Sequence, residues 1–251
     1  MSVTMWKKEA KHCLKTRKLR AFRISLCLAA LSVFFGFASY YLPQTIALVS
    51  QDKLLPTAAQ IMLLVLSTAL IGALRQGRTA WMYCSACGRE PSRVQFLFWL
   101  RRGRGFRAAL LFLNIRIRKT AWTVLMCLPS VGILIGAGVV ADRQNTAIRL
   151  IAWIGGSVSL LIGLFLARFV HEQYSLAPIL FARSPKKGVR SAIRGSCALM
   201  QDECARVFLL DLSFLPWALA CLCAIPLAYV IPYYQQSKTC MLRDILRAHT
   251  I

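Results

Sequence analysis

The sequence is poor in acidic residues and histidine, and this counts against most classes of enzyme. Its 251 residues include nine Asp and Glu and three His. It contains no Ser-His-Asp set, no HExxH helix, no phosphate-binding loop and no paired carboxylates, so the usual groups for acid–base or metal-dependent chemistry are missing. We therefore expect a protein that is not an enzyme and that uses no cofactor.

Charged residues are also few in total, and the sequence contains long apolar runs. They make up 16% of the chain, whereas soluble domains carry about 25%. Hydrophobic residues make up 57%, and the mean hydropathy is +0.56. The remaining charge is lopsided, because 32 Lys and Arg against 9 Asp and Glu give a net charge of +23. A basic nucleic-acid-binding domain would lack such apolar runs, so we expect no nucleic-acid partner and predict an integral membrane protein.

Six stretches are predicted to cross the membrane, as helices of an all-α polytopic bundle that forms one integral membrane domain over residues 1–251. Uncharged runs of about 18 residues or more are long enough to span the hydrocarbon core. The first run lacks the cleavage site of a secretory signal, so we expect it to be retained. The last two spans come from one apolar stretch with three prolines, and a count of five spans is the alternative. The predicted spans are 24–42, 54–74, 120–141, 150–170, 207–224 and 226–240.

The third predicted span contains a proline and closely spaced glycines. Pro129 is tolerated in a membrane helix because neighbouring helices satisfy the backbone groups that it frees. Gly132 and Gly136 are four residues apart, which allows a second helix to approach closely. We favour close packing within this bundle over a dimer motif.

Basic residues alternate along the chain between dense and sparse segments. Eight precede the first span, eleven lie between the second and third, and seven follow the fourth, whereas the two intervening loops hold one and two. By the positive-inside rule, the dense segments face the cytoplasm. With six spans the tail faces it too, and 29 of the 32 basic residues then lie on one side. We predict a multi-pass protein of the inner (cytoplasmic) membrane with a cytoplasmic N-terminus.

Three cytoplasmic segments interleave basic and apolar residues at helical spacing: the N-terminal stretch, residues 94–113 and residues 186–200. This pattern is typical of a helix that lies on a membrane surface. Each Lys or Arg near anionic headgroups contributes about 1 kcal/mol of attraction. The alternative is that these residues only follow the positive-inside rule and bind no particular lipid. The candidate contacts to anionic inner-leaflet lipids are Lys186, Lys187, Arg190 and Arg194.

One acidic residue, Asp211, lies inside a predicted span. Ionisable groups within the membrane are candidates for function. Arg168 and His171, near the cytoplasmic end of the fourth span, are its expected partners at similar depth. We favour a structural ion pair, and the alternative is a proton or substrate relay in a small transporter or channel.

Two of the ten cysteines form a candidate metal-binding pair. Cys84 and Cys87, followed by Gly88, have the spacing of half a zinc ribbon. A closed zinc site needs two further ligands at suitable spacing, and the sequence offers none. We therefore expect no bound metal.

The C-terminal half resembles a known family. The segments Tyr174-Ser-Leu-Ala-Pro178, Phe208-Leu-Leu-Asp211-Leu-Ser213-Phe214 and Pro232-Tyr233-Tyr234 are similar, in order and spacing, to bacterial integral membrane proteins of domain of unknown function 975. Arg183-Ser184-Pro185 departs from the acidic Asp-Asn-Pro typical of that family. The resemblance implies a bacterial membrane protein and brings no catalytic residue or substrate. We expect a protein that organises or senses membrane lipid or supports a membrane protein partner.

Overall fold

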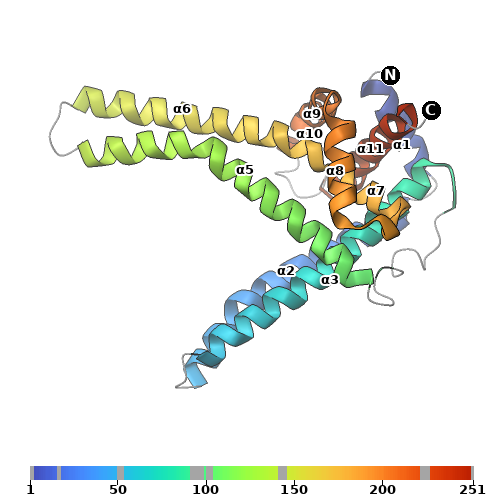
Figure 1. The fold of residues 1–251 in the computed structure, drawn as a ribbon, viewed down its shortest axis with the longest axis horizontal. Helices are drawn as coiled ribbons and strands as arrows, with labels where there is room; N and C mark the ends of the chain where they lie inside the picture. The colour runs from blue at the N-terminus through green and yellow to red at the C-terminus, as the bar shows by residue number, and fades with distance from the viewer. Residues whose placement is uncertain are drawn as a thin grey trace.

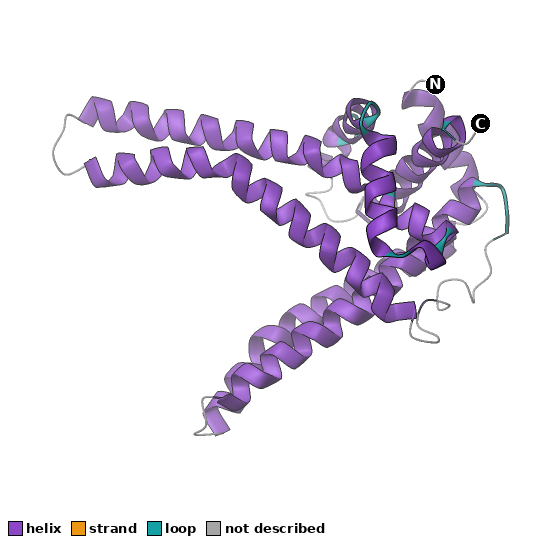
Figure 2. Ribbon diagram, viewed as in Figure 1, coloured by secondary structure: helices purple, strands orange, loops and turns teal. Residues whose placement is uncertain are grey.

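All of the secondary structure seen in the protein is helical (Figure 2). The computed structural model describes residues 3–15, 18–49, 54–90, 99, 104–140, 146–220 and 227–249, and these ranges contain no strand. Two long helical hairpins diverge from a smaller helical head, which also holds both ends of the chain (Figure 1). The predicted all-α fold class is confirmed.

The hairpins contain the four helices that are long and apolar enough to cross a membrane. The first hairpin pairs α2 (Lys18–Val49) with α3 (Leu54–Ala86), and the second pairs α5 (Arg104–Val140) with α6 (Thr146–His171). Their apolar side chains point outward, as in a helix surrounded by lipid, and Ile151 is 70% exposed. The first, second and fourth predicted spans lie inside these helices, and so does the third up to Val140, since residue 141 lies outside the described residues.

Both α3 and α5 extend beyond the thickness of a membrane core. A helix of 32 residues such as Leu55–Ala86 is about 48 Å long, whereas the hydrocarbon core is about 30 Å thick. The part of each helix that extends beyond the membrane core lies toward the head and contains basic residues, such as Arg75 of α3 and Arg116 of α5. The basic segment predicted separately over 94–113 is continuous with the span from Arg104 onward, and its earlier part, apart from Trp99, lies outside the described residues.

The head is assembled from both ends of the chain. Its core contains fully buried Leu176, Met200, Leu210 and Met241, and burying a side chain of this size stabilises the fold by about 1.5–3 kcal/mol. Helix α11 packs against α1 and against the end of α3. The elements of the head are α1 (Val3–Lys15), the short 3-10 helices η2 (Glu172–Tyr174) and η3 (Pro185–Lys187), α7 (Ala177–Arg183), α8 (Val189–Met200), α9 (Cys204–Leu212), α10 (Leu215–Ala220) and α11 (Leu227–Ala248).

The C-terminal quarter differs from the prediction. The continuous helix expected over 207–224 is wrong, because α9 ends at Leu212 and a turn at Ser213 separates it from α10. Helix α11 replaces the span expected at 226–240, and it buries Gln236 and Ser237 inside the head. Among the described residues, four helices rather than six have the length and composition of a membrane span.

The amphipathic helices α1 and α8 use their apolar faces inside the head. Trp6, Ala10 and Leu14 of α1 are buried, and α1 packs against α11. In α8, Ile193 and Met200 are buried, and α8 packs against α7 and η2. The apolar faces expected to lie on the membrane are therefore covered by protein.

The close packing of α5 against α6 does not involve the predicted glycine pair. A Cβ atom added to Gly132 or Gly136 would meet nothing within 4 Å. On α6, a Cβ atom at Gly163 would lie 2.7 Å from the carbonyl oxygen of Met126, and the hydroxyls of Ser130 and Ser159 are 2.8 Å apart. Small residues do allow these two helices to pack closely, but the residues at the contact are Gly163, Ser130 and Ser159 rather than Gly132 and Gly136.

Candidate functional site

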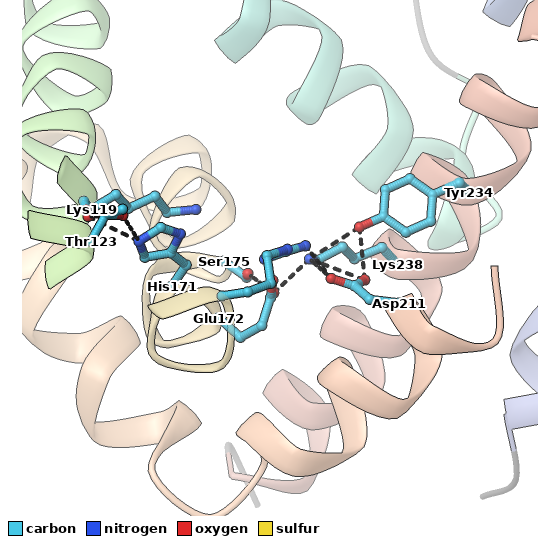
Figure 3. Close-up of polar contacts among 9 residues, drawn as sticks. Lys119, Thr123, His171, Glu172, Ser175, Asp211, Tyr234 and Lys238 are labelled. Atoms are coloured by element: carbon cyan, nitrogen blue, oxygen red, sulfur yellow. Dashed lines mark hydrogen bonds and ion pairs between the residues drawn. The ribbon is translucent and has the colours of Figure 1, made fainter. Parts of the chain in front are cut away.

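An ion-pair network joins the head end of α6 to α9 and α11 (Figure 3). The guanidinium of Arg168, in the last turn of α6, donates to the carboxylate of Glu172 and to that of Asp211. Lys238 of α11 donates to Glu172 Oε2 at 2.5 Å and lies 3.4 Å from Asp211 Oδ2. Two carboxylates thus alternate with two cations, and each charge has an opposite charge within hydrogen-bonding reach.

Glu172 lies at the centre of the network. Its side chain is fully buried, and it accepts hydrogen bonds from Arg168, Lys238 and the hydroxyl of Ser175. A buried carboxylate is costly unless it is paired and hydrogen-bonded. The chain meets this requirement by placing Glu172 four residues after Arg168 and by bringing α11 over both.

Asp211 closes the other side of the network. The hydroxyl of Tyr234 donates to Asp211 Oδ1 at 2.7 Å. Burial raises the pKa of the Asp211 carboxyl above its ordinary value, although the charge of Lys238 opposes the shift. Burial, together with the nearby Asp211 charge, also raises the pKa of the Tyr234 hydroxyl, which keeps it a hydrogen-bond donor.

Of the residues predicted here, the structure brings Asp211 and Arg168 together and places His171 elsewhere. His171 Nε2 lies 2.9 Å from the carbonyl oxygen of Lys119 and 3.2 Å from the hydroxyl of Thr123, so it faces α5. The side chain of Lys119 extends from α5 toward the network (Figure 3), and its charge interacts with those of all four ionic members.

A second ionic cluster holds α1 onto α11. The guanidinium of Arg243 binds both oxygens of Glu9, at 2.7 and 2.9 Å, and also binds the side chain of Asp244 and the carbonyl oxygen of Ala86. Trp6 Nε1 donates to Asp244 Oδ2 at 2.9 Å. This arrangement fixes the N-terminal helix to the C-terminal helix and to the end of α3.

The predicted lipid contacts lie on the surface of the head. Lys186, Lys187, Arg190 and Arg194 are all exposed. The first two lie in η3 and the other two on α8. Since the apolar side of α8 is buried in the head, these basic residues form its outward side.

The candidate cysteine pair lies at the end of a helix. Cys84 is in the last turn of α3, and the backbone N–H of Cys87 donates to the carbonyl oxygen of Tyr83 at 3.0 Å. Gly88 follows with a φ of +75°, the conformation that favours glycine at a helix C-terminus. Within the described ranges, no three His, Cys, Asp or Glu side chains are grouped as metal ligands would be.

Several members of these clusters were not identified from the sequence. Lys238 lies within the span predicted over 226–240, and no prediction was made for Glu172, Arg243, Glu9 or Asp244. One signal was present for Glu172, because Arg168 and Glu172 are four residues apart and so share a helix face. The long-range partners on α11 gave no comparable signal.

Comparison with protein families matches residues 1–249 to the family described as "Protein of unknown function (DUF975)". Comparison with curated proteins gives no match, and neither does comparison with solved structures.

Proposed function

Since the chain belongs to the DUF975 family, which its match over residues 1–249 shows, we propose that it is a non-enzymatic, multi-pass protein of the bacterial inner (cytoplasmic) membrane. Its head lies on the cytoplasmic side, and the basic residues of η3 and α8 hold anionic lipid of the inner leaflet. The observation that carries the proposal is that α8 has an exposed basic side, whereas its apolar side is buried in the head.

The placement of charge supports a cytoplasmic head. Arg23, Arg75, Lys119 and Arg168 directly border the uncharged runs of the four long helices, each at the end that leads to the head. With four crossings, both ends of the chain lie on the same side, and 29 of the 32 basic residues lie there too. The positive-inside rule assigns that side to the cytoplasm.

Burial of the apolar side of α8 supports lipid contact through charge rather than insertion. Ile193 and Met200 are inside the head, so α8 has no free apolar face to place among acyl chains. Its exposed basic residues remain able to contact phosphate headgroups, with about 1 kcal/mol of attraction for each residue near the surface. Such contacts weaken as salt screens them.

Orientation can be tested with single-cysteine variants in a background without other cysteines. A membrane-impermeant maleimide added to intact spheroplasts is expected to label the variant Asp52→Cys, whose cysteine lies between α2 and α3 in the sequence, and to leave Thr250→Cys unlabelled until the cells are opened. The reverse pattern would place the head outside and contradict the proposal.

Lipid contact can be tested by native mass spectrometry of the full chain extracted from vesicles of phosphatidylglycerol and phosphatidylcholine. The variant K186Q/K187Q/R190Q/R194Q is expected to retain less phosphatidylglycerol than the wild type. The variant K8Q/K11Q/K15Q removes three exposed charges from α1 and so controls for loss of positive charge elsewhere on the head. Equal loss in both variants, or no loss in the first, would contradict a contact made by η3 and α8.

The paired state of Asp211 does not favour the transporter alternative. A relay needs a group that is free to exchange a proton or a ligand, whereas Asp211 is held by Arg168, Lys238 and Tyr234. Substrate flux in proteoliposomes that is abolished by Asp211→Asn in a correctly folded variant would instead favour transport.

A further inference from the structure

The exposed large apolar side chains of the head are concentrated in one stretch of the chain. Among the described residues outside the four long helices, they are Met5 and five residues between 209 and 229. We call these five the apolar patch. They are Leu209 and Leu212 of α9, Leu215 and Trp217 of α10, and Tyr229 of α11. A concentration of exposed apolar side chains is typical of an interaction surface.

Aromatic contacts hold the two ends of the patch together. The ring of Phe214, just before α10, lies 5.3 Å from the ring of Tyr233, and Tyr233 stacks on Tyr229 at 5.7 Å. The turn between α9 and α10 is also fixed, because Lys7 Nζ of α1 donates to the carbonyl oxygen of Ser213 at 3.0 Å. The exposed residues of the three helices therefore lie on one packed part of the head.

Two contacts fix the level of α9 along the second hairpin. The ring of Phe208 lies 4.8 Å from the ring of Phe165 on α6. The carboxylate of Asp211 is bound by the guanidinium of Arg168. Figure 1 shows α9 at the head end of α6. Since Phe165 lies in the uncharged run 150–167 and Arg168 directly follows it, α9 lies where the apolar part of this membrane helix ends.

The patch is continuous with the outward side of α6. Phe165 is 51% exposed, and Leu209, which follows its partner Phe208, is 56% exposed. The sequence from 212 to 237 contains no charged residue. Acyl chains that surround α6 can therefore extend onto the patch without taking a further charge out of water, and a charge would oppose such contact.

The length of α10 limits how deeply this part of the head can enter the membrane. Its six residues are about 9 Å long, whereas the hydrocarbon core is about 30 Å thick. The helix is thus too short to cross. Tryptophan and tyrosine are enriched where the core meets the headgroups, and the patch contains Trp217 and Tyr229. Its composition and size suit shallow insertion into one leaflet.

We propose that the apolar patch contacts lipid and inserts among the acyl chains, close to the headgroups, of the leaflet on the head side of the membrane. It holds the head against the membrane and places the Arg168–Asp211 pair at headgroup level. This inference rests on the proposed placement of the hairpins in the membrane. It does not depend on lipid binding by the basic residues of η3 and α8.

Tryptophan fluorescence of the full chain in phosphatidylcholine vesicles tests the contact. One quencher is phosphatidylcholine brominated on the acyl chain near the headgroup, and the other is acrylamide in the water. The difference between the wild type and W217F gives the contribution of Trp217. We expect the brominated lipid to remove most of this contribution and acrylamide to remove little of it.

Two further variants provide references. Trp153 of α6 is 48% exposed and Trp217 is 46% exposed, so W153F reports an equally open tryptophan in a membrane helix. Trp81 is buried, so W81F reports a tryptophan that both quenchers reach poorly. The Trp217 contribution should respond like that of Trp153 and unlike that of Trp81.

The references separate failure of this inference from failure of the proposed function. If the brominated lipid quenches Trp153 and only acrylamide quenches Trp217, the patch faces water and the inference alone is overturned. Protection of Trp217 from both quenchers would show that protein, such as a second copy of the chain, covers the patch, and this would also overturn it. Quenching of Trp153 by acrylamide alone would instead contradict the membrane placement of the hairpins.

A second measurement leaves Trp217 in place. A nitroxide is attached to L215C in a background without other cysteines, and its accessibility to oxygen, which concentrates among acyl chains, is compared with that to a nickel chelate, which stays in water. We expect L215C to resemble L161C, on the outward side of α6, and to differ from K11C, on the exposed side of α1. A label at L215C that resembles the one at K11C would overturn the inference.

Discussion

Lys238 donates a hydrogen bond to Glu172 Oε2 at 2.5 Å, across a separation of 66 residues in the chain. The contact connects the last described helix of the head to the end of the fourth membrane helix. It therefore couples the position of the second hairpin to the assembly of the head.

Substituting Glu172 with Gln is expected to destabilise the protein by about 3–5 kcal/mol, because the cations that it pairs would lose a fully buried counter-charge. Denaturant unfolding in detergent would measure the loss. Glu203→Gln is the control, since Glu203 pairs with the exposed Arg206, and such a pair contributes about 0–1 kcal/mol. Similar losses of stability in both variants would show that the buried network stabilises the fold no more than an exposed ion pair does.

Substituting Arg243 with Ala is expected to loosen α1, because Arg243 is the buried centre that binds Glu9, Asp244 and the carbonyl oxygen of Ala86. We expect a cost of about 3 kcal/mol and faster hydrogen exchange over residues 3–15. Glu9→Gln should cost about 1 kcal/mol, since Arg243 keeps its other partners. Unchanged exchange in the Arg243 variant would contradict this role.

Gly163→Ala is expected to destabilise the second hairpin by about 1–3 kcal/mol, because its Cβ would meet the backbone of α5 at Met126. Gly132→Ala, in the same hairpin, should change stability by less than about 0.5 kcal/mol, because that Cβ would meet open space. Thermal unfolding of the two variants in one detergent makes the comparison. A larger loss at Gly132 would contradict the packing described here.

Cys204 is expected to react slowly with iodoacetamide. It is buried, and burial raises the pKa of its thiol to about 11. A raised pKa leaves less thiolate at a given pH, so labelling of a variant with Cys204 as its single cysteine should be slow at pH 8 and should quicken as the pH rises. The denatured variant provides the reference rate. Equal rates for the folded and denatured forms would contradict this environment.

The sequence allowed the hairpins to be predicted better than the head. Uncharged runs such as 54–74 and 150–167 were predicted correctly as helices. In lipid, the backbone of an apolar run has to pair its polar groups internally, so such a run forms a helix whatever its neighbours are. The C-terminal stretch was misread because its apolar residues, among them Leu210 and Phe214, pack against the other helices of the head. Hydropathy does not distinguish a residue that faces lipid from one that faces protein.

The candidate site was only partly predictable for a related reason. Asp211 stood out as a charge in an apolar stretch, and Arg168 could be matched to it by depth. Lys238 could not be matched, because its partner Glu172 lies 66 residues earlier and one sequence carries no information on such a distant contact. The glycine pair was misassigned because spacing alone does not show which side of a helix another helix occupies.

The packing of α1 against α11 has a consequence for the order in which the protein is made. The ribosome synthesises α1 before the two hairpins and α11 after them, so α1 has no partner while the four long helices are being made. The head can therefore close only after translation has passed α11. A nascent chain stopped before Leu227 would carry inserted hairpins and an N-terminal helix whose buried face, with Trp6 and Leu14, is still uncovered.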